Sequence, residues 1–238
     1  GLLNYLTDNF VRKHKDVEPL IMCPSQYNKG WTSGDYLNTL GTKMYPEVRI
    51  MWTGNSVVDM IEENDMQWIN DQIKRKAYIW LNYPVNDYCQ SRILMGKTYG
   101  NGLNINDMVS GFCSNPMEYA EASKVSLYSI ADYTWNMPAY DSVRSWERAL
   151  GALMPTSADA FRVFCENNVD LGRTGHGLRR KGESPTFMAS SETIGGLAES
   201  FQQLVWAADN LLADEVNNPE MLAEIKPWVE SMRLLGQR

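Results

Sequence analysis

Short apolar runs alternate with amphipathic stretches through the first half of the chain. Each run is rich in aliphatic, β-branched or aromatic residues and stops near a proline, glycine, serine or asparagine, which is typical of buried strands. The pattern predicts four strands, at residues 18–23, 48–52, 77–81 and 108–113. Apolar residues at helical spacing predict helices at residues 2–14, 36–43, 57–61 and 65–73, and a crossover helix that begins at 90–94.

The second half of the chain has a different pattern. After Pro116 the apolar spacing is helical and predicts no strand. The predicted helices span residues 118–130, 141–154, 157–167, 192–213 and 219–235. Four strand-then-helix units usually build a parallel barrel or an open sheet, and four units are half of a barrel. We therefore predict an α/β fold, with a half TIM-type β/α barrel at residues 1–117 followed by an all-α helical domain at residues 118–238.

Composition narrows the class of protein. The 238 residues include 22 Lys and Arg against 29 Asp and Glu, a net charge of -7, so no broad basic surface for nucleic acid is expected. The chain has no apolar run long enough to suggest a membrane span. The cysteines lie far apart without paired spacing, which argues against a structural zinc site or a disulfide framework and predicts mostly buried thiols. They are Cys23, Cys89, Cys113 and Cys165.

Polar residues follow each predicted strand. In chain order they include Tyr27, Thr53, Asn82, Asp87 and Asn115. In a parallel barrel, the loops at the carboxyl ends of the strands surround the substrate, so amides and a carboxylate there indicate ligand contacts. The alternative is ordinary turn chemistry, because Asn and Asp also cap helices and close turns. Near the end of the third strand, Trp80 lies close to Asn82 and Asp87 in the sequence, and its presence beside these polar groups favours a binding site.

Three further features have simpler structural interpretations. His176 lies in a glycine-rich stretch at residues 170–181. It could be an interdomain hydrogen-bonding group or a titrating acid, and the structural role is favoured because a lone histidine carries little specificity. Glu62 and Glu63 are adjacent carboxylates, but they lie among other acidic residues in a helical stretch, which is typical of a solvated face. Large aromatic side chains usually pack in the core. We therefore expect six tryptophans to be core or packing residues rather than sugar platforms: Trp31, Trp52, Trp135, Trp146, Trp206 and Trp228.

Four motifs occur in order at the strand exits. They are MCPSQYNK at residues 22–29, MWTG at 51–54, WLNYPVNDY at 80–88 and SGFCSNPME at 110–118. This series resembles glycoside hydrolase family eighty-four, which contains the O-GlcNAcases and bacterial β-N-acetylglucosaminidases. Further matches at residues 120–124, 170–172 and 175–177 extend the resemblance over roughly residues 2–180.

The resemblance implies a retaining hydrolysis in which the 2-acetamido oxygen of the sugar attacks the anomeric carbon, so no carboxylate nucleophile is needed. In the family, one Asp orients the acetamide and the neighbouring Asp is the general acid and base. That pair follows the fourth barrel strand, so the strands of this chain correspond to strands five to eight. No adjacent aspartates occur in the 238 residues. The resemblance therefore implies a fragment that lacks its catalytic pair, is inactive alone and uses no cofactor or metal.

The resemblance also implies roles in binding the N-acetyl group. Tyr27 resembles the tyrosine that hydrogen-bonds near the acetamide and the anomeric centre. Thr53 and Trp80 resemble parts of the acetamide pocket, with Cys23 beside them. Asn82 resembles the asparagine near the catalytic pair and the sugar.

Two further residues resemble those that bind the sugar hydroxyls. Asp87 resembles the aspartate that accepts hydrogen bonds from the 4- and 6-hydroxyls, and Asn115 resembles the asparagine on the side of the 4-hydroxyl. A sugar offers hydroxyl donors and a face of C–H bonds, which carboxylate, amide and aromatic groups recognise. Leu81 and Gln26 depart from the family, in which many relatives have a second tryptophan and an acidic residue. These departures bear on peripheral affinity more than on the identity of the sugar.

Other functions stay open at this stage. The chain is alternatively a non-catalytic GlcNAc-binding or interaction module, or Asp87 is a general acid in an unrelated barrel hydrolase. The expected partner is a GlcNAc-bearing glycan or glycoprotein, with neither nucleic acid nor a membrane. Because four parallel strands leave two edges and one face uncovered, we also expect a homo-oligomer through the open half-barrel. The compartment stays open, since a targeting segment would precede residue 1.

Overall fold

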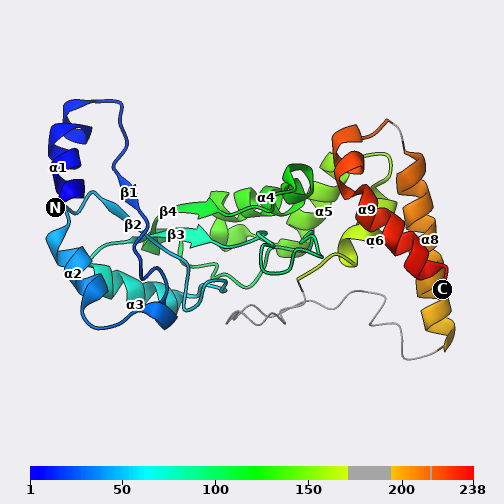
Figure 1. Ribbon diagram of the computed structural model, residues 1–238, viewed down its shortest axis with the longest axis horizontal. Coiled ribbons are helices and arrows are strands. Elements are labelled where there is room, and N and C mark those ends of the chain that lie inside the picture. The colour runs from blue at the N-terminus through cyan, green and yellow to red at the C-terminus, as the bar shows by residue number, and fades with distance from the viewer. Residues whose placement is uncertain (171–193, 215) are drawn as a thin grey trace.

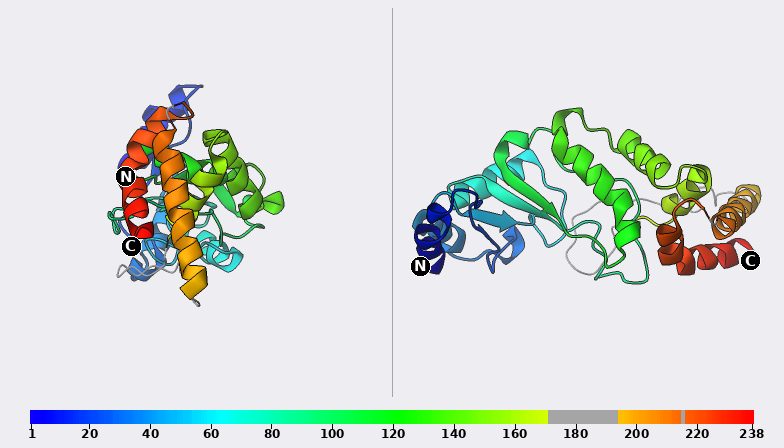
Figure 2. Two further views of the ribbon diagram at one scale, coloured as in Figure 1. Left: turned by 90° about the vertical axis from the view of Figure 1, so that its right-hand side faces the viewer. Right: turned by 90° about the horizontal axis from the view of Figure 1, so that it is seen from above.

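The computed structural model describes residues 1–170, 194–214 and 216–238 of the chain. A parallel sheet and the N-terminus lie at one end, and the last helices and the C-terminus lie at the other (Figure 1). Seen from above, the same elongated arrangement is clear (Figure 2). A sheet region and a helical region therefore follow each other along the long axis.

The sheet consists of β1 (Ile21–Met22), β2 (Arg49–Trp52), β3 (Ala77–Leu81) and β4 (Val109–Ser114). Neighbouring strands are parallel and pair in chain order. Adjacent parallel strands need a crossover connection, so the loops that follow all four strands lie at the same edge of the sheet. The predicted α/β fold class is confirmed, although β1 keeps only two residues of the predicted strand.

Helices make up the rest of the regular structure. The α-helices of the described residues are α1 (Leu2–Asn9), α2 (Tyr36–Lys43), α3 (Glu63–Ile73), α4 (Ala120–Trp135), α5 (Ser142–Leu153), α6 (Ala158–Glu166), α8 (Ile194–Ala213) and α9 (Pro219–Gly236). Short 3-10 turns occur at η1 (Val11–Lys13), η2 (Lys29–Trp31), η3 (Asn106–Met108) and η4 (Met137–Ala139). Beyond β4, every described element is a helix, as predicted.

The two faces of the sheet differ in burial. Ile50 and Ile79 point to a fully buried face, where they share a core with Ile69 of α3. Met51 and Tyr78 are paired across β2 and β3 on the opposite face, and both are only partly buried. Side chains alternate between the faces of a strand, so this second face corresponds to the inside of a barrel.

The predicted helix at residues 57–61 is wrong, because this segment consists of bends and irregular chain. The carboxylate of Asp59 accepts hydrogen bonds from the backbone N–H groups of Asn55 (2.6 Å) and Met60 (3.0 Å). The hydroxyl of Ser56 donates to the carbonyl oxygen of Val58 (2.8 Å). Such local side-chain bonds compete with the backbone bonds of a helix.

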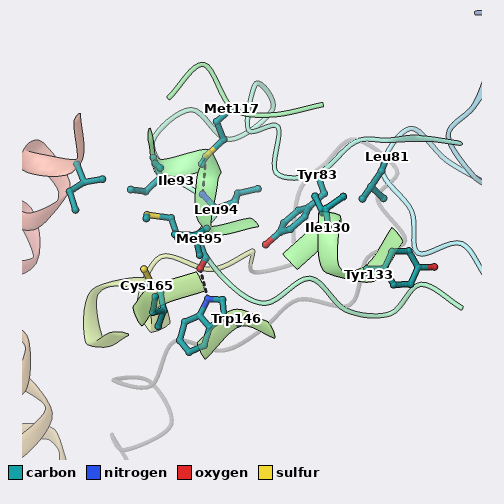
Figure 3. Close-up of a cluster of buried hydrophobic side chains, with 14 of the residues drawn as sticks. Leu81, Tyr83, Ile93, Leu94, Met95, Met117, Ile130, Tyr133, Trp146 and Cys165 are labelled. Carbon is teal, nitrogen blue, oxygen red and sulfur yellow. Dashed lines mark hydrogen bonds between the residues drawn. The ribbon is translucent and has the colours of Figure 1, made fainter. Parts of the chain in front are cut away.

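The predicted crossover helix at residues 90–94 is also wrong. Residues 86–92 form turns, and Ile93, Leu94 and Met95 continue as irregular chain that is fully buried. Figure 3 shows these three side chains inside the hydrophobic cluster that joins the sheet region to the helices. A short apolar run that is buried in a loop has the same sequence pattern as the start of a buried helix.

The tryptophans are divided between core and surface. Trp52 and Trp146 are fully buried, and Trp228 is partly buried against the core. Three others are exposed and therefore do not lie in the core, which the prediction of a core or packing role had allowed: Trp31 (54% exposed), Trp135 (90%) and Trp206 (47%). Of these three, Trp31 proves to be relevant to the candidate site.

The four cysteines are free thiols. Cys165 is buried, Cys89 and Cys113 are partly buried, and Cys23 is exposed. The expectation of mostly buried thiols is therefore wrong. Cys23 is not covered by other residues, because it directly follows β1. This two-residue edge strand is itself open to solvent, and its Ile21 is 45% exposed.

One hydrophobic core runs through both regions of the molecule. It includes Ile79 of β3, Trp146 of α5 and Ile225 of α9. The division at residues 117 and 118 stays a prediction, although the last strand ends before it. None of the described helices combines the length and the apolar character needed to cross a membrane.

Candidate functional site

A cavity of about 480 Å³ lies at the carboxyl ends of the strands. Its lining residues come from the segments that follow β1, β2, β3 and β4, together with Trp80 near the end of β3. They are Tyr27, Trp31, Val57, Val58, Trp80, Asn82, Val85, Asp87, Tyr88 and Asn115. The structure thus brings together five of the residues singled out in the sequence: Tyr27, Trp80, Asn82, Asp87 and Asn115.

Three aromatic rings form one wall of the cavity. The ring centroid of Tyr27 lies 4.9 Å from that of Trp31 and 5.3 Å from that of Trp80. Trp31 is held by η2, where the side-chain oxygen of Asn28 accepts a hydrogen bond from the Trp31 N–H (3.0 Å). A wall of edge-on and tilted aromatic rings suits the C–H face of a pyranose.

The position of Tyr27 is fixed through its backbone. Its carbonyl oxygen accepts a hydrogen bond from the Thr53 N–H at 2.9 Å. Burial raises the pKa of the Tyr27 hydroxyl, and the nearby Cys23 thiol raises this pKa further. The hydroxyl is therefore neutral at physiological pH and available as a hydrogen-bond donor.

Two predicted site residues do not line the cavity. Thr53 is 1% exposed, and its hydroxyl donates to the carbonyl oxygen of Ser56 at 2.9 Å, so it supports the wall from behind. Cys23 lies outside the cavity lining, and partial desolvation by the surrounding protein raises the pKa of its thiol. Because the thiol is protonated at neutral pH, it is a poor nucleophile.

Asn82 and Asn115 form a linked pair at the exits of β3 and β4. The Asn82 side-chain amide donates to the carbonyl oxygen of Val57 at 2.7 Å. The Asn115 side-chain amide donates to the carboxamide oxygen of Asn82 at 3.1 Å. Asn82 is only 5% exposed, so its main contribution is to orient Asn115 and the segment after β2.

Asp87 lies on the loop after β3 and is exposed at the cavity. This loop is tied to the exit of β4, because the Val85 N–H donates to the carbonyl oxygen of Asn115 at 2.9 Å. The Tyr83–Pro84 peptide bond that opens the loop is cis. Among the lining residues that the structure describes, Asp87 is the one carboxylate.

The valines of the cavity wall were missed in the sequence, because Val57 and Val58 were assigned to a helix. Their position depends on Gly54, which has a φ of +121°. A Cβ atom at residue 54 would lie 2.5 Å from the Cβ of Asp59. Glycine therefore allows the Asp59 side chain to fold against the start of the segment and direct the valines towards the cavity.

Trp31 could have been found, because it lies four residues after Tyr27 within the same strand-exit loop. His176 lies outside the described residues. Glu62 and Glu63 are exposed, as predicted, and Glu62 caps α3 through a capping box with Asp65. Within the part of the chain that the structure describes, no three His, Cys, Asp or Glu side chains are placed to hold a metal ion.

The sequence is similar to known β-N-acetylglucosaminidases. The family profile described as beta-N-acetylglucosaminidase matches residues 1–166. The curated proteins named Protein O-GlcNAcase from Rattus norvegicus and Mus musculus are each 28% identical over 145 residues. These matches cover 58% of this chain and 16% of each relative, so the chain spans a small part of the length of these relatives.

Solved structures extend the similarity to nearly the whole chain. The structure of CpGH84B superimposes with a TM-score of 0.88 at 24% identity, a likeness of fold, and covers 99% of this chain and 44% of its own. The structure of CpGH84D has a TM-score of 0.86 at 30% identity, and the match covers 99% of this chain and 42% of CpGH84D. A mutant O-GlcNAc hydrolase of Thermobaculum terrenum has a TM-score of 0.80 at 25% identity, and the match covers 99% of this chain and 53% of the hydrolase. With the profile match over most of the sequence, these likenesses show that the chain belongs to the β-N-acetylglucosaminidase family, glycoside hydrolase family eighty-four.

Proposed function

We propose that the cavity binds the terminal GlcNAc of a glycan or glycoprotein, and that this chain supplies the sugar-binding part of a retaining β-N-acetylglucosaminidase site. The observation that carries the proposal is the convergence of Tyr27, Asp87 and Asn115 on one cavity. Its volume of about 480 Å³ lies within the range of small-molecule sites. The cavity is lined by aromatic rings, amides and one carboxylate, which are the groups that a sugar requires.

In this proposal each lining group has a distinct role. Asp87 accepts hydrogen bonds from sugar hydroxyls, since its carboxylate is exposed at the cavity. Asn115 offers its carboxamide oxygen to a hydroxyl while its amide nitrogen is held by Asn82. The rings of Tyr27 and Trp80 contact the C–H bonds and the N-acetyl group. Polar groups placed to bind hydroxyls discriminate against analogues that lack them, because the groups would otherwise be left unpaired.

The chemical step needs groups beyond those that line the cavity. In substrate-assisted retention, the acetamide oxygen attacks the anomeric carbon, a general acid protonates the leaving group, and water then opens the oxazoline. The 238 residues contain no adjacent aspartates. We propose that the acid pair is not part of these 238 residues, and that this chain alone does not turn over substrate.

The proposal is tested by adding an aryl β-N-acetylglucosaminide to the purified 238-residue chain. No release of the phenol is expected, because neither the acetamide-orienting carboxylate nor the general acid is present. Measurable turnover that depends on the chain would contradict the proposal. Its abolition by Asp87→Asn would then point to Asp87 as an acid instead.

The alternative is a dedicated, non-catalytic GlcNAc-binding module. It is favoured by the presence of Asp87 as the one carboxylate among the described lining residues. Isothermal titration calorimetry with GlcNAc separates the two functions. Part of an enzyme site binds weakly, with a dissociation constant of about 1 mM or more, whereas a micromolar constant favours the binding module.

A further inference from the structure

The loop that carries Asp87 is closed on itself. The Cys89 N–H donates to the carbonyl oxygen of Asn86 at 2.8 Å, and the Arg92 N–H donates to that of Cys89 at 2.9 Å. The side-chain amide of Asn86 donates to the carbonyl oxygen of Arg92 at 2.5 Å. Residues 86–92 therefore form one linked element, and the position of Asp87 depends on what holds this element.

Helix α9 holds the loop from the helical region. The indole N–H of Trp228 donates to the carbonyl oxygen of Ser91 at 3.3 Å, although the two residues are 137 positions apart. The same indole packs edge-on against Tyr119, with ring centroids 4.9 Å apart and an interplanar angle of 78°. Tyr119 directly precedes α4, so the loop and the start of α4 share one contact on α9.

A second residue of α9 contacts the start of α4 directly. The carboxylate of Glu224 accepts a hydrogen bond from the Ala122 N–H at 2.7 Å. This N–H belongs to the first turn of α4, where backbone donors have no partner within the helix. Helix α4 begins five residues after Asn115. Glu224 and Trp228 are four residues apart and therefore lie on the same face of α9.

The far end of the loop is fixed independently of α9. The Leu94 N–H donates to the sulfur of Met117, and the indole N–H of Trp146 donates to the carbonyl oxygen of Met95 at 2.9 Å (Figure 3). A change at Trp228 therefore removes one restraint on the loop without releasing its buried end. A variant at Trp228 can therefore shift the Asp87 loop without unfolding the protein.

We propose that α9 is a positioning element for the cavity. Trp228 sets the position of the Asp87 loop, and Glu224 sets the start of α4 beyond Asn115, so the helical region controls the affinity of the cavity for its sugar. The identity of the sugar rests on the proposed function, whereas the positioning of the loop does not.

The test compares Trp228→Phe with Trp206→Phe, which makes the same chemical change at an exposed site on α8. Phenylalanine keeps the aromatic contact with Tyr119 but cannot donate to Ser91. We expect amide hydrogen exchange at residues 85–92 to become about fivefold faster, and GlcNAc binding by NMR titration about fivefold weaker, as for the loss of one hydrogen bond. Exchange in β3 and all properties of Trp206→Phe should be unchanged.

A second pair of variants examines Glu224. Glu224→Ala should accelerate exchange at residues 119–123, and Glu224→Gln should restore it, because the glutamine oxygen can still accept the Ala122 N–H. Unchanged exchange at residues 85–92 in Trp228→Phe would overturn the proposal. Faster exchange in Trp228→Phe with unchanged GlcNAc affinity would contradict the claim that the helical region controls the affinity of the cavity. If the unaltered chain binds no GlcNAc, the proposed function fails, while the exchange data still decide whether α9 positions the loop.

Discussion

The side-chain amide of Asn115 donates a hydrogen bond to the carboxamide oxygen of Asn82 across 3.1 Å, although the two residues are 33 positions apart. Asn82 in turn donates to the carbonyl oxygen of Val57. A single chain of hydrogen bonds therefore joins the segments that follow β2, β3 and β4. This chain fixes one side of the cavity before any ligand is bound, which lowers the cost of ordering on binding.

The Asn82–Asn115 hydrogen bond should be measurable in a double-mutant cycle. Asn82→Ala leaves the Val57 carbonyl without its donor, so the free energy of unfolding should fall by about 2 kcal/mol, and Asn115→Ala should cost about 1 kcal/mol. Both variants lose the same bond, so the double variant should lose about 1 kcal/mol less than the sum. Urea denaturation gives these values. Additive losses would show that the bond does not contribute.

Arg75 should be a major source of stability in the sheet region. Its guanidinium donates to four carbonyl oxygens around the end of α2 and the start of β2, those of Gly41, Met44, Tyr45 and Val48. Arg75→Met should lower the free energy of unfolding by about 3 kcal/mol, because these acceptors lose their donor. Lys76→Met, at the exposed neighbour, is the control and should change it by less than about 0.5 kcal/mol. Equal effects of the two changes would contradict this role.

The sequence was sufficient for elements whose pattern repeats over several residues. Helix α2 has the predicted limits, because its buried residues Leu37 and Gly41 are one helical turn apart. Strand β3 is the predicted strand, because buried and partly buried side chains alternate along it. The predictions at residues 57–61 and 90–94 were wrong for two different reasons. At residues 57–61, the Asp59 carboxylate accepts backbone hydrogen bonds that compete with those of a helix. At residues 90–94, the apolar pattern reflects a buried loop, because Ile93, Leu94 and Met95 are buried without forming a helix.

The candidate site was partly predictable for a related reason. Strand exits in a parallel sheet meet at one edge, so Asp87 and Asn115 could be grouped without coordinates. Whether a side chain faces the cavity or the layer behind it depends on local turns. The Thr53 side chain turns back to the carbonyl of Ser56. Trp31, predicted to be a core or packing residue, is instead exposed at the cavity.

Asp214 should give stability that depends on pH in the acid range. Ser157 donates a hydrogen bond to its carboxylate at 2.6 Å, and this bond lowers the pKa of Asp214 below the usual 3.8. Because the pKa is lower in the folded state, the ionised carboxylate stabilises the fold at pH values above the ordinary pKa of 3.8. This stabilisation is lost as the pH falls through the pKa of the folded state.

The corresponding change is Asp214→Asn. Thermal unfolding at neutral pH should show a loss of less than about 1 kcal/mol, since the carboxylate is partly solvated. The difference from the unaltered chain should shrink as the pH falls below 3.8 and vanish at lower pH. A difference that is constant across this range would contradict the assignment to ionisation.

The chain should associate through the open side of its sheet. Apolar side chains of α1, of its C-cap and of the edge strand β1 are exposed, including Leu2 (71%), Phe10 (50%) and Ile21 (45%). Light scattering should give a mass at least twice that of one chain, and the double change Leu2→Ser with Phe10→Ser should reduce it. Val216→Ser, at a side chain 87% exposed in the turn before α9, should leave the mass unchanged. A monomeric unaltered chain would contradict this prediction.

The central claim is that the strand-exit cavity binds GlcNAc through the carboxylate of Asp87. An NMR titration with GlcNAc tests it most directly, using the unaltered chain, Asp87→Asn, and Asp107→Asn as a matched control at an exposed aspartate outside the cavity. We predict saturable shifts at Asn82, Asp87 and Asn115, and about tenfold weaker binding in Asp87→Asn alone, because a charged acceptor is lost. No saturable shifts in the unaltered chain, or equal affinity in Asp87→Asn, would contradict the account.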